Sequence, residues 1–358
     1  MWQQPVSIIA YLLVAVLVVF LSIFLSTFVD LLDKKTNVSG AFLGSILLAA
    51  TTSLPELFTS LTASLLVNNN ALVYGDILGS NLFNMMLFAI IYLFFFKKLA
   101  ESKFNRKQHI ITIVFIGLMY IGTYIASFVF DFNHILWGWF NPMSIFIVAV
   151  YALYVIKTPT EEEKEEEEET NSRFDKLSVK QIIILFIIFA LGLIGASIGM
   201  TYLADWVVQV FGMNATFGGA LFLGVATSLP EMTATITLCK KKNFNAAYGN
   251  ILGSCCFNFI ILTLADLLSF YLMNKPVEER FGLYYLDQNA FLLMVLGTVS
   301  LLSVLFSLIV SNSKKFKDSF PNRFAIYAVG FIVLGSYITY LILSNINLGL
   351  AFAPFVRG

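Results

Sequence analysis

The chain has 358 residues, of which 58% are hydrophobic and only 12% are charged, and its mean hydropathy is +0.83. One soluble core could not bury so much apolar surface, so a soluble globular protein is excluded and the expected surroundings are lipid. The formal net charge is zero, and we expect no nucleic-acid partner.

Apolar stretches recur along the whole chain, each long enough to cross a hydrocarbon core of about 30 Å as a helix of about 20 residues. Strands are not expected, because the stretches are continuously apolar and lipid accepts only helices or closed barrels. In chain order the ten predicted spans are 8–29, 40–67, 71–96, 110–130, 135–156, 179–211, 215–238, 244–272, 290–310 and 324–343.

The basic residues set the expected orientation, since lysine and arginine are retained on the cytoplasmic side. Ten spans with the N-terminus outside place 19 of the 22 basic residues in inner loops. Both termini are then outside and the central loop is cytoplasmic. Its acidic run, 161–169, should stay solvated as a linker rather than form a calcium sensor. The compact length and short loops favour a prokaryotic plasma membrane, with an organelle membrane as the alternative.

The chain resembles itself at an offset of 175 and then 174 residues. The sequence TSLPE occurs at 52–56 and at 227–231, and YGDILGSNLFN at 74–84 matches YGNILGSCCFN at 248–258 in 8 of 11 positions. Five predicted spans, an odd number, separate equivalent points, so the second copy crosses the membrane with opposite polarity. Inverted repeats are typical of secondary transporters, whose substrate sites lie at the midplane between broken helices.

The predicted organisation is two transmembrane halves joined by a short linker. The first half, 1–157, contains one repeat at about 40–96, and the second half, 179–358, contains the other at about 215–272. Residues 158–178 form the acidic cytoplasmic linker. The expected fold class is therefore an all-α polytopic membrane protein with ten transmembrane helices in two inverted five-helix repeats.

A proline lies near the middle of the second and of the seventh predicted span. Pro55 and Pro230 lack an N–H group and so free the carbonyls of Thr51 and Ala226. In lipid a freed carbonyl must be satisfied by protein, water or an ion. We therefore expect helices 2 and 7 to be broken at the midplane.

A glutamate follows each of these prolines at the expected bilayer centre, where an ionised carboxylate costs from about 2.5 kcal/mol upward and is a functional candidate by default. Helical spacing places hydroxyl and amide groups beside these acids. The candidate cation ligands are Glu56, Glu231, Asn84, Asn258, Ser53, Ser228, Ser80, Ser254, Thr52 and Thr227. All offer oxygen, which suits Ca2+ with its roughly 6 to 8 oxygen ligands and also suits Na+. Soft metals are disfavoured and no cofactor is expected.

These motifs resemble the two alpha repeats of the sodium/calcium exchangers, which belong to the calcium/cation antiporter superfamily. Their hallmarks are Gly-Thr-Ser-Leu-Pro-Glu and Gly-Ser-x-x-Phe-Asn (or Asp) in each half. The resemblance implies alternating access by sliding of a two-helix gate bundle. It also implies a diamond of ion sites formed by Glu56, Asn84, Glu231 and Asn258, with the four serines and backbone oxygens near Thr52 and Thr227 completing the shell.

The sequence departs from this pattern at Thr51 and Ala226, which replace the glycine, and at Asn258, where sodium/calcium exchangers commonly have Asp. Only two acids then remain in the diamond, and one Ca2+, two Na+ or two protons would each neutralise them. Sodium is favoured because both Thr-Ser-Leu-Pro-Glu runs are intact, whereas proton-coupled relatives usually carry a different run. The alternative is exchange of protons for Ca2+ or another divalent cation, because buried glutamates can carry protons.

Other classes of function fit the sequence less well. A passive channel could use the same oxygens, but channels usually build selectivity from symmetric rings around a continuous pore. An enzyme is not expected, because the chain has neither a nucleophile with its base nor a His-Glu-x-x-His metal motif.

Two further acids lie near the repeats. Asp266 follows Asn258 by about two helical turns, and its counterpart in the first half is Tyr92. It could line a vestibule or relay protons, but a structural acid satisfied by nearby hydroxyls is the simpler expectation. Asp76 precedes an expected turn at Gly79 and Ser80 and matches Asn250, so we expect a structural role, with ion entry as the alternative.

Overall fold

The structure is a computed structural model that describes residues 3–36, 51–101, 105–128, 142–157, 176–272, 287–310, 320–344 and 346. Within these residues every regular element is a helix. Seven helices are long and apolar enough to cross a membrane, a bent pair in the second repeat would make an eighth, and a further apolar helix is shorter. The predicted all-α membrane fold is confirmed. The count of ten spans stays a prediction, because the second span is described only from residue 51 onward.

Each of the ten predicted spans coincides with at least one described helix. The helices are α1 (Gln3–Thr36), α3 (Leu54–Leu65), α4 (Asn70–Phe94), α5 (Phe96–Glu101), α6 (Arg106–Phe128), α7 (Pro142–Lys157), α8 (Val179–Phe211), α9 (Ala215–Gly218), the π-helix η1 (Gly219–Gly224), α10 (Val225–Thr227), α11 (Leu229–Lys240), α12 (Phe244–Leu272), α13 (Gln288–Val310) and α14 (Phe320–Leu343).

Helix α8 shows how local chemistry sets such boundaries. The Ser178 hydroxyl accepts a hydrogen bond from the backbone N–H of Gln181 at 3.3 Å, and the Gln181 side chain accepts one from the backbone N–H of Ser178 at 2.9 Å. This reciprocal pair satisfies donors that a helix start otherwise leaves free. At the other end Gly212 has a φ of 62°, a left-handed conformation that only glycine adopts at little cost, and the helix stops there.

Contacts between the ends of the helices fall into two groups, which lie on opposite faces. One group joins expected outer segments: Asn69 to Asp205 at 3.1 Å, Asn214 to Asp287 at 2.9 Å, and Gln288 to the carbonyl oxygen of Ile346 at 2.9 Å. The other joins expected inner segments: Lys35 to the carbonyl oxygen of Leu177 at 2.6 Å, and the backbone N–H of Asn105 to Asn245 at 2.8 Å. This grouping agrees with the predicted alternation of the spans and with the opposite polarity of the two repeats.

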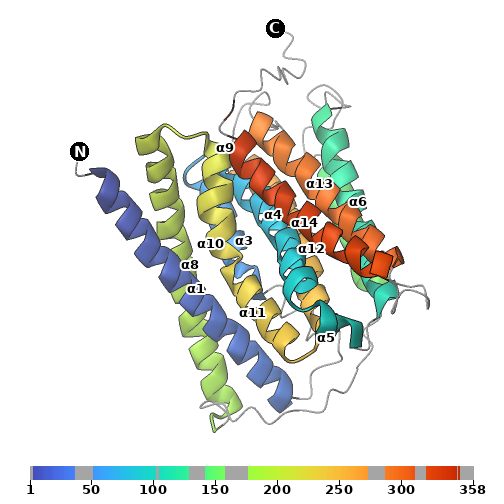
Figure 1. Cartoon of the computed structure of the whole chain (residues 1–358). Helices are drawn as coiled ribbons and strands as arrows, with labels where there is room; N and C mark the ends of the chain where they lie inside the picture. The colour runs from blue at the N-terminus through green and yellow to red at the C-terminus, as the bar shows by residue number, and fades with distance from the viewer. Residues whose placement is uncertain are drawn as a thin grey trace.

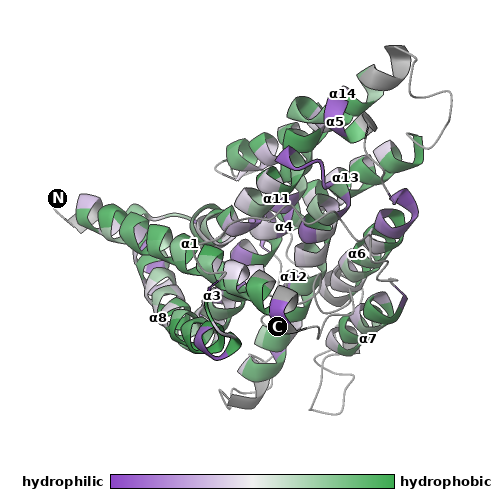
Figure 2. Cartoon of the chain, turned by 90° about the horizontal axis from the view of Figure 1, so that it is seen from below, coloured by the Kyte–Doolittle hydropathy of each residue, from purple (hydrophilic) through white to green (hydrophobic). Residues whose placement is uncertain are grey.

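The molecule has two regions with different surroundings. Helices α1 and α8 pack side by side along one edge (Figure 1) and are covered by apolar residues (Figure 2). Leu13 and Val16 on α1 are each 67% exposed, and Leu191 on α8 is 64% exposed. Side chains so apolar and so exposed are suited to contact with lipid. Helices α4 and α12, in contrast, lie at the centre of the remaining helices, and most of their residues are buried.

Helix α4 crosses α9 and η1 with unusually close backbone contact. A Cβ atom at Gly75 would lie 2.2 Å from the carbonyl oxygen of Thr216, and one at Gly79 would lie 2.6 Å from the Cα atom of Ala220. Only glycine fits at such a crossing, as in other membrane helix pairs. The expected turn at Gly79 and Ser80 is therefore wrong, because α4 continues as a helix through both residues.

Candidate cation site at the two helix breaks

Both repeats interrupt a helix at the serine of the Thr-Ser-Leu-Pro-Glu motif. Ser228 separates α10 from α11, and the helical segments on either side of it are bent by 44°. Ser53 occupies the equivalent place before α3. Each proline then lies in the first turn of the new helix, where its missing N–H group leaves no bond unmade. The predicted break in helix 7 is confirmed, and in helix 2 the described residues show the start of the new helix.

The two breaks lie against each other and exchange hydrogen bonds. The Ser228 hydroxyl donates to Oε1 of Glu56 at 3.3 Å, and the Ser53 hydroxyl donates to Oε1 of Glu231 at 3.2 Å. Both glutamates are fully buried, with 0% of their surface exposed. Each carboxylate is thus held by the serine of the other repeat, which is the reciprocal contact expected of two inverted copies that meet at one site.

Helices α4 and α12 complete the shell around the two glutamates. The Ser254 hydroxyl donates to Oε1 of Glu231 at 3.3 Å, lies 2.9 Å from the Ser53 hydroxyl and accepts a hydrogen bond from Nδ2 of Asn84 at 3.3 Å. On the other side the Ser80 hydroxyl donates to the carbonyl oxygen of Gly224 at 3.2 Å. It also lies 3.4 Å from the hydroxyl of Thr227.

The two threonines of the motif belong to the same shell. Thr52 interacts with Glu231 and Thr227 with Glu56, again across the repeats. The Thr227 hydroxyl also donates to the carbonyl oxygen of Leu223 at 2.9 Å. All ten predicted ligand residues are buried. Nine of them form two groups at the breaks, one around Glu231 and one around Glu56. The tenth, Asn258, is anchored by Asn81, as described below.

Four oxygen atoms of the ten predicted ligands have no hydrogen-bond partner among the described residues: Oε2 of Glu56, Oδ1 of Asn84, Oε2 of Glu231 and Oδ1 of Asn258. An unpaired buried polar atom costs about 1–3 kcal/mol, and more if it is charged. No lysine or arginine is buried in the part of the chain whose burial is described, so no side-chain cation offsets the two carboxylates there. Carboxylate, amide and hydroxyl oxygens of this kind suit a hard cation, so the group is a candidate cation site.

The site does not depend on a cluster of conventional metal-binding side chains. Within the described ranges no three His, Cys, Asp or Glu side chains come together as a metal centre. The three cysteines are buried free thiols packed in the apolar core, and Cys255 also lies beside Asn84 and Glu231. The candidate ligands are therefore two carboxylates with neutral amide and hydroxyl oxygens, which favours an alkali or alkaline-earth cation over a soft metal.

Asp76 lies beside this site, and one of its two carboxylate oxygens is bonded within its own helix pair, whereas Oδ1 has no partner among the described residues. Its Oδ2 atom accepts hydrogen bonds from the Thr59 hydroxyl at 2.5 Å and the Ser60 hydroxyl at 2.8 Å, which tie α3 to α4. Its counterpart Asn250 donates to the Thr235 hydroxyl at 3.3 Å and ties α11 to α12 in the same way. This contact agrees with the expected structural role. Asp76 also interacts electrostatically with Glu56, so it adds negative charge near the site.

Asp266 lies apart from the group at the breaks. It is 6% exposed, and its Oδ2 atom accepts a hydrogen bond from the Ser144 hydroxyl at 2.8 Å, which joins α12 to α7. This is the simpler of its two expected roles, an acid satisfied by a nearby hydroxyl. A proton relay through Asp266 stays a hypothesis.

One residue of the site is missing from the predicted set. Asn81 is 1% exposed, and its Oδ1 atom accepts a hydrogen bond from Nδ2 of Asn258 at 3.0 Å. Its counterpart in the second repeat is Cys255, so comparison of the repeats gives no sign of an amide at this position. The only signal available in the sequence is a polar residue among the apolar positions of a membrane helix.

The comparison with known families agrees with the geometry of the site. The model of the sodium/calcium exchanger protein family matches residues 6–157 and 182–345. The chain belongs to the sodium/calcium exchanger family. No curated protein is significantly similar to it in sequence. The resemblance inferred from the two repeats is therefore confirmed, and because the family consists of ion exchangers, the prediction of a transporter rather than an enzyme is confirmed as well.

Solved structures similar to this family member come from several exchangers. The structure of native YfkE is 17% identical, covers 95% of this chain and 97% of its own, and has a TM-score of 0.64. The H+/Ca2+ exchanger CAX is 14% identical over 94% of this chain and 90% of its own, with a TM-score of 0.61. The sodium-calcium exchanger NCX_Mj, soaked with Na+ and Sr2+, is 17% identical over 95% of this chain and 99% of its own, with a TM-score of 0.55. At these identities the likeness shows a shared fold.

Proposed function

We propose that this exchanger moves Ca2+ across the membrane in exchange for Na+, by alternating access to the site between the two helix breaks. The observation that carries the proposal is the set of four buried oxygens of Glu56, Asn84, Glu231 and Asn258 without a partner among the described residues. They come from both repeats and from four different helical segments. A cation bound among them would satisfy all four at once.

The charge of the group supports a divalent cation with monovalent competitors. Glu56 and Glu231 supply two negative charges, and the other ligands are neutral. One Ca2+ neutralises the pair, and so do two Na+. When no cation is bound, the two uncompensated carboxylates in a region of low dielectric oppose the conformational change that opens the site to the other side of the membrane. Transport therefore requires an occupied site.

The alternative counter-ion is the proton, which neutralises a carboxylate without further ligands. Burial of Glu56 and Glu231, with no buried lysine or arginine in the described part of the chain, also suits protonation. We place Na+ first because both Thr-Ser-Leu-Pro-Glu runs are intact, whereas proton-coupled relatives usually carry a different run before the glutamate.

Helices α1 and α8 are the proposed mobile pair. They meet the helix breaks through an apolar cluster that includes Val18, Leu193, Leu223 and Ala226. Among the described residues, polar contacts also join this pair to the rest: the Tyr11 hydroxyl to the carbonyl oxygen of Phe222, the Thr201 hydroxyl to that of Thr59 at 3.4 Å and, at the outer end, Asn69 to Asp205. Apolar surfaces can slide without leaving polar groups unpaired, so this boundary suits the shift between outward and inward openings.

The orientation of the chain is part of the same proposal. The inner face is the one with Lys35, Asn105 and the end of α11 at Lys240, because the basic residues concentrate there. Both termini then lie outside the cytoplasm and the acidic linker within it. The membrane is proposed to be a prokaryotic plasma membrane.

The test is 45Ca2+ uptake into proteoliposomes loaded with Na+ or with acid, each against vesicles without a gradient. Uptake driven by the Na+ gradient alone supports the proposal, and uptake driven by the proton gradient alone establishes the alternative. Uptake that needs no counter-ion indicates a channel. Absence of uptake under every condition contradicts Ca2+ transport. Asp205→Asn is the matched control, because Asp205 is an acid at the end of α8 whose partners, Asn69 and Gln209, are amides.

A further inference from the structure

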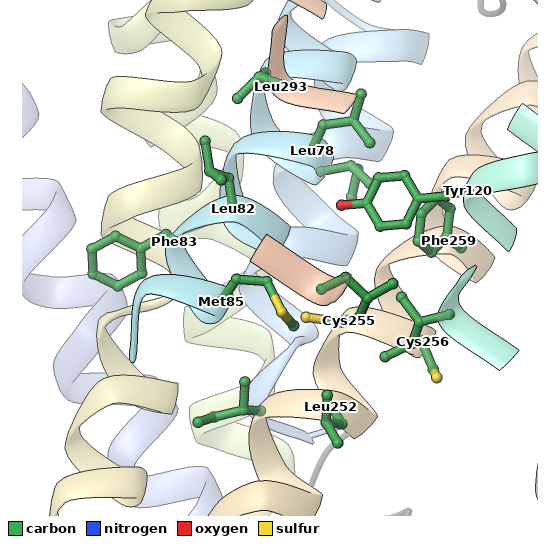
Figure 3. Close-up of a cluster of buried hydrophobic side chains, with 14 of the residues drawn as sticks. Leu78, Leu82, Phe83, Met85, Tyr120, Leu252, Cys255, Cys256, Phe259 and Leu293 are labelled. Atoms are coloured by element: carbon green, nitrogen blue, oxygen red, sulfur yellow. The ribbon is translucent and has the colours of Figure 1, made fainter. Parts of the chain in front are cut away.

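The buried amide of Asn81 lies on α4 and contacts Asn258 at the candidate cation site. On the same helix Leu78, Leu82 and Met85 are also buried (Figure 3). Tyr120, which interacts with Asn81, packs edge to face against Phe259, with 4.9 Å between the ring centroids (Figure 3). A polar side chain in such a place is costly unless it is hydrogen-bonded. Its contact with Asn258 is therefore the feature to explain.

The two site amides are anchored in different ways. Asn84 donates to the hydroxyl of Ser254 on the facing helix. The repeat symmetry would pair Asn258 with Ser80, but the Ser80 hydroxyl bonds instead to the carbonyl oxygen of Gly224 and lies next to Thr227. Asn258 donates to Asn81. An additional amide thus replaces, in one half, the hydroxyl that anchors the amide in the other.

An amide side chain offers an oxygen at one position and an NH2 group at the other. Only the oxygen can bind a cation, and the NH2 group facing a cation would repel it. Because Nδ2 of Asn258 donates to Asn81, Oδ1 is the atom left without a partner among the described residues. An aspartate in place of Asn258 would not need such an anchor, since either of its oxygens could face the ion.

We propose that Asn81 is a positioning residue that holds the amide of Asn258 with its oxygen toward the cation site and thereby sets the affinity for Ca2+. The inference rests on the proposed function, because it assigns a task to a residue that supports the same site. It differs from a packing role in one respect: the effect of Asn81 should depend on whether the side chain it contacts is an amide or a carboxylate.

The test is a double-mutant cycle between Asn81→Leu and Asn258→Asp, with the apparent Ca2+ affinity measured both as 45Ca2+ exchange and as 45Ca2+ binding to purified protein. In the wild-type background, Asn81→Leu should weaken the affinity about tenfold, as loss of outer-shell support for metal ligands commonly does. In the Asn258→Asp background the same change should have an effect below about threefold, because a carboxylate no longer needs orientation.

Equal losses in both backgrounds, or no loss in either, would overturn the inference and leave Asn81 with a packing role. Should Asn81→Leu fail to elute as a monodisperse species, Asn81→Cys serves instead, because Cys255 shows that the equivalent position accepts cysteine. Wild-type protein that exchanges Ca2+ while the cycle shows no coupling contradicts this inference alone. Wild-type protein that neither binds nor exchanges Ca2+ contradicts both this inference and the proposed function.

Discussion

The two repeats place the same ligands at the site but support them differently. In both, the serine at the break holds the glutamate of the other repeat at 3.2–3.3 Å. Around this shared pair the first repeat has Asp76 and Asn81 where the second has Asn250 and Cys255. The symmetry is therefore kept in the serine–glutamate contacts across the repeats, although Ser254 also donates to Glu231 and Asp76 lies near Glu56, and it is lost around the amides. We infer that the two glutamates do equivalent work and that the two asparagines do not.

The strongest test of this equivalence is to remove one carboxylate at a time. Glu56→Gln and Glu231→Gln should each reduce 45Ca2+ exchange about 100-fold or more, because loss of one charged partner from a buried ion site costs about 3–5 kcal/mol. Asp205→Asn should exchange at the wild-type rate. Substantial residual exchange in both glutamine variants, with the proteins folded, would contradict the assignment of the site. A large loss in only one variant would show that the carboxylates are not equivalent.

Adding a carboxylate at each of the two asparagine positions should show whether Asn84 and Asn258 have different roles. Asn258→Asp brings a third negative charge to the site and should raise the number of monovalent ions exchanged per Ca2+ by one. It should therefore make exchange depend on a membrane potential set with K+ and valinomycin. Asn84→Asp adds the same charge in the other repeat and is the matched comparison. If Asn258→Asp changes neither the Ca2+ affinity nor this stoichiometry, the charge balance proposed for the site is wrong.

Giving Asp76 of the α3–α4 pair and Asn250 of the α11–α12 pair each other's side chain should mainly change the stability of the protein. Thr59 and Ser60 both donate to Oδ2 of Asp76, so the oxygen of Asp76→Asn can accept from both, and the free energy of unfolding in detergent should fall by no more than about 1 kcal/mol. Asn250→Asp should cost more, because Asn250 donates to the carbonyl oxygen of Glu231 at 3.4 Å and an aspartate would oppose that oxygen with its own. Equal or reversed losses would show that Asp76 is more than a tie between α3 and α4.

The smallest effect on exchange is expected at Asp266, which does not belong to either helix break. Asp266→Asn keeps an acceptor for the Ser144 hydroxyl. We therefore expect the pH dependence of Ca2+ exchange to be the same as in the wild type when uptake is measured across neutral and mildly alkaline pH. A shifted or flattened pH profile would favour the relay role instead.

Much of the site could be predicted because its position follows from covalent chemistry. A proline in the middle of a span interrupts the helix there, and a glutamate next to it in an apolar span has few other purposes. Glu56 and Glu231 occur twice in the same context, and this duplication predicted that they would meet. The described contacts between Ser53 and Glu231, and between Ser228 and Glu56, agree with that expectation.

The contact between Asn81 and Asn258 could not be predicted in the same way. Comparison of repeats pairs equivalent positions, whereas this hydrogen bond joins two that are not equivalent. The misreading of Gly79 has a related cause. Gly-Ser usually marks a turn, but in a membrane helix glycine also permits close crossing, and the sequence of α4 alone does not show that η1 crosses there.

The length of the α1–α8 pair has a consequence for the lipid around it. With 34 and 33 residues, the helices measure about 50 Å each at about 1.5 Å per residue, well beyond a hydrocarbon core of about 30 Å. Such helices must tilt or extend past the core, and the balance between the two shifts with membrane thickness. We therefore expect the turnover rate of this exchanger to depend on bilayer thickness and to change in vesicles with shorter or longer acyl chains.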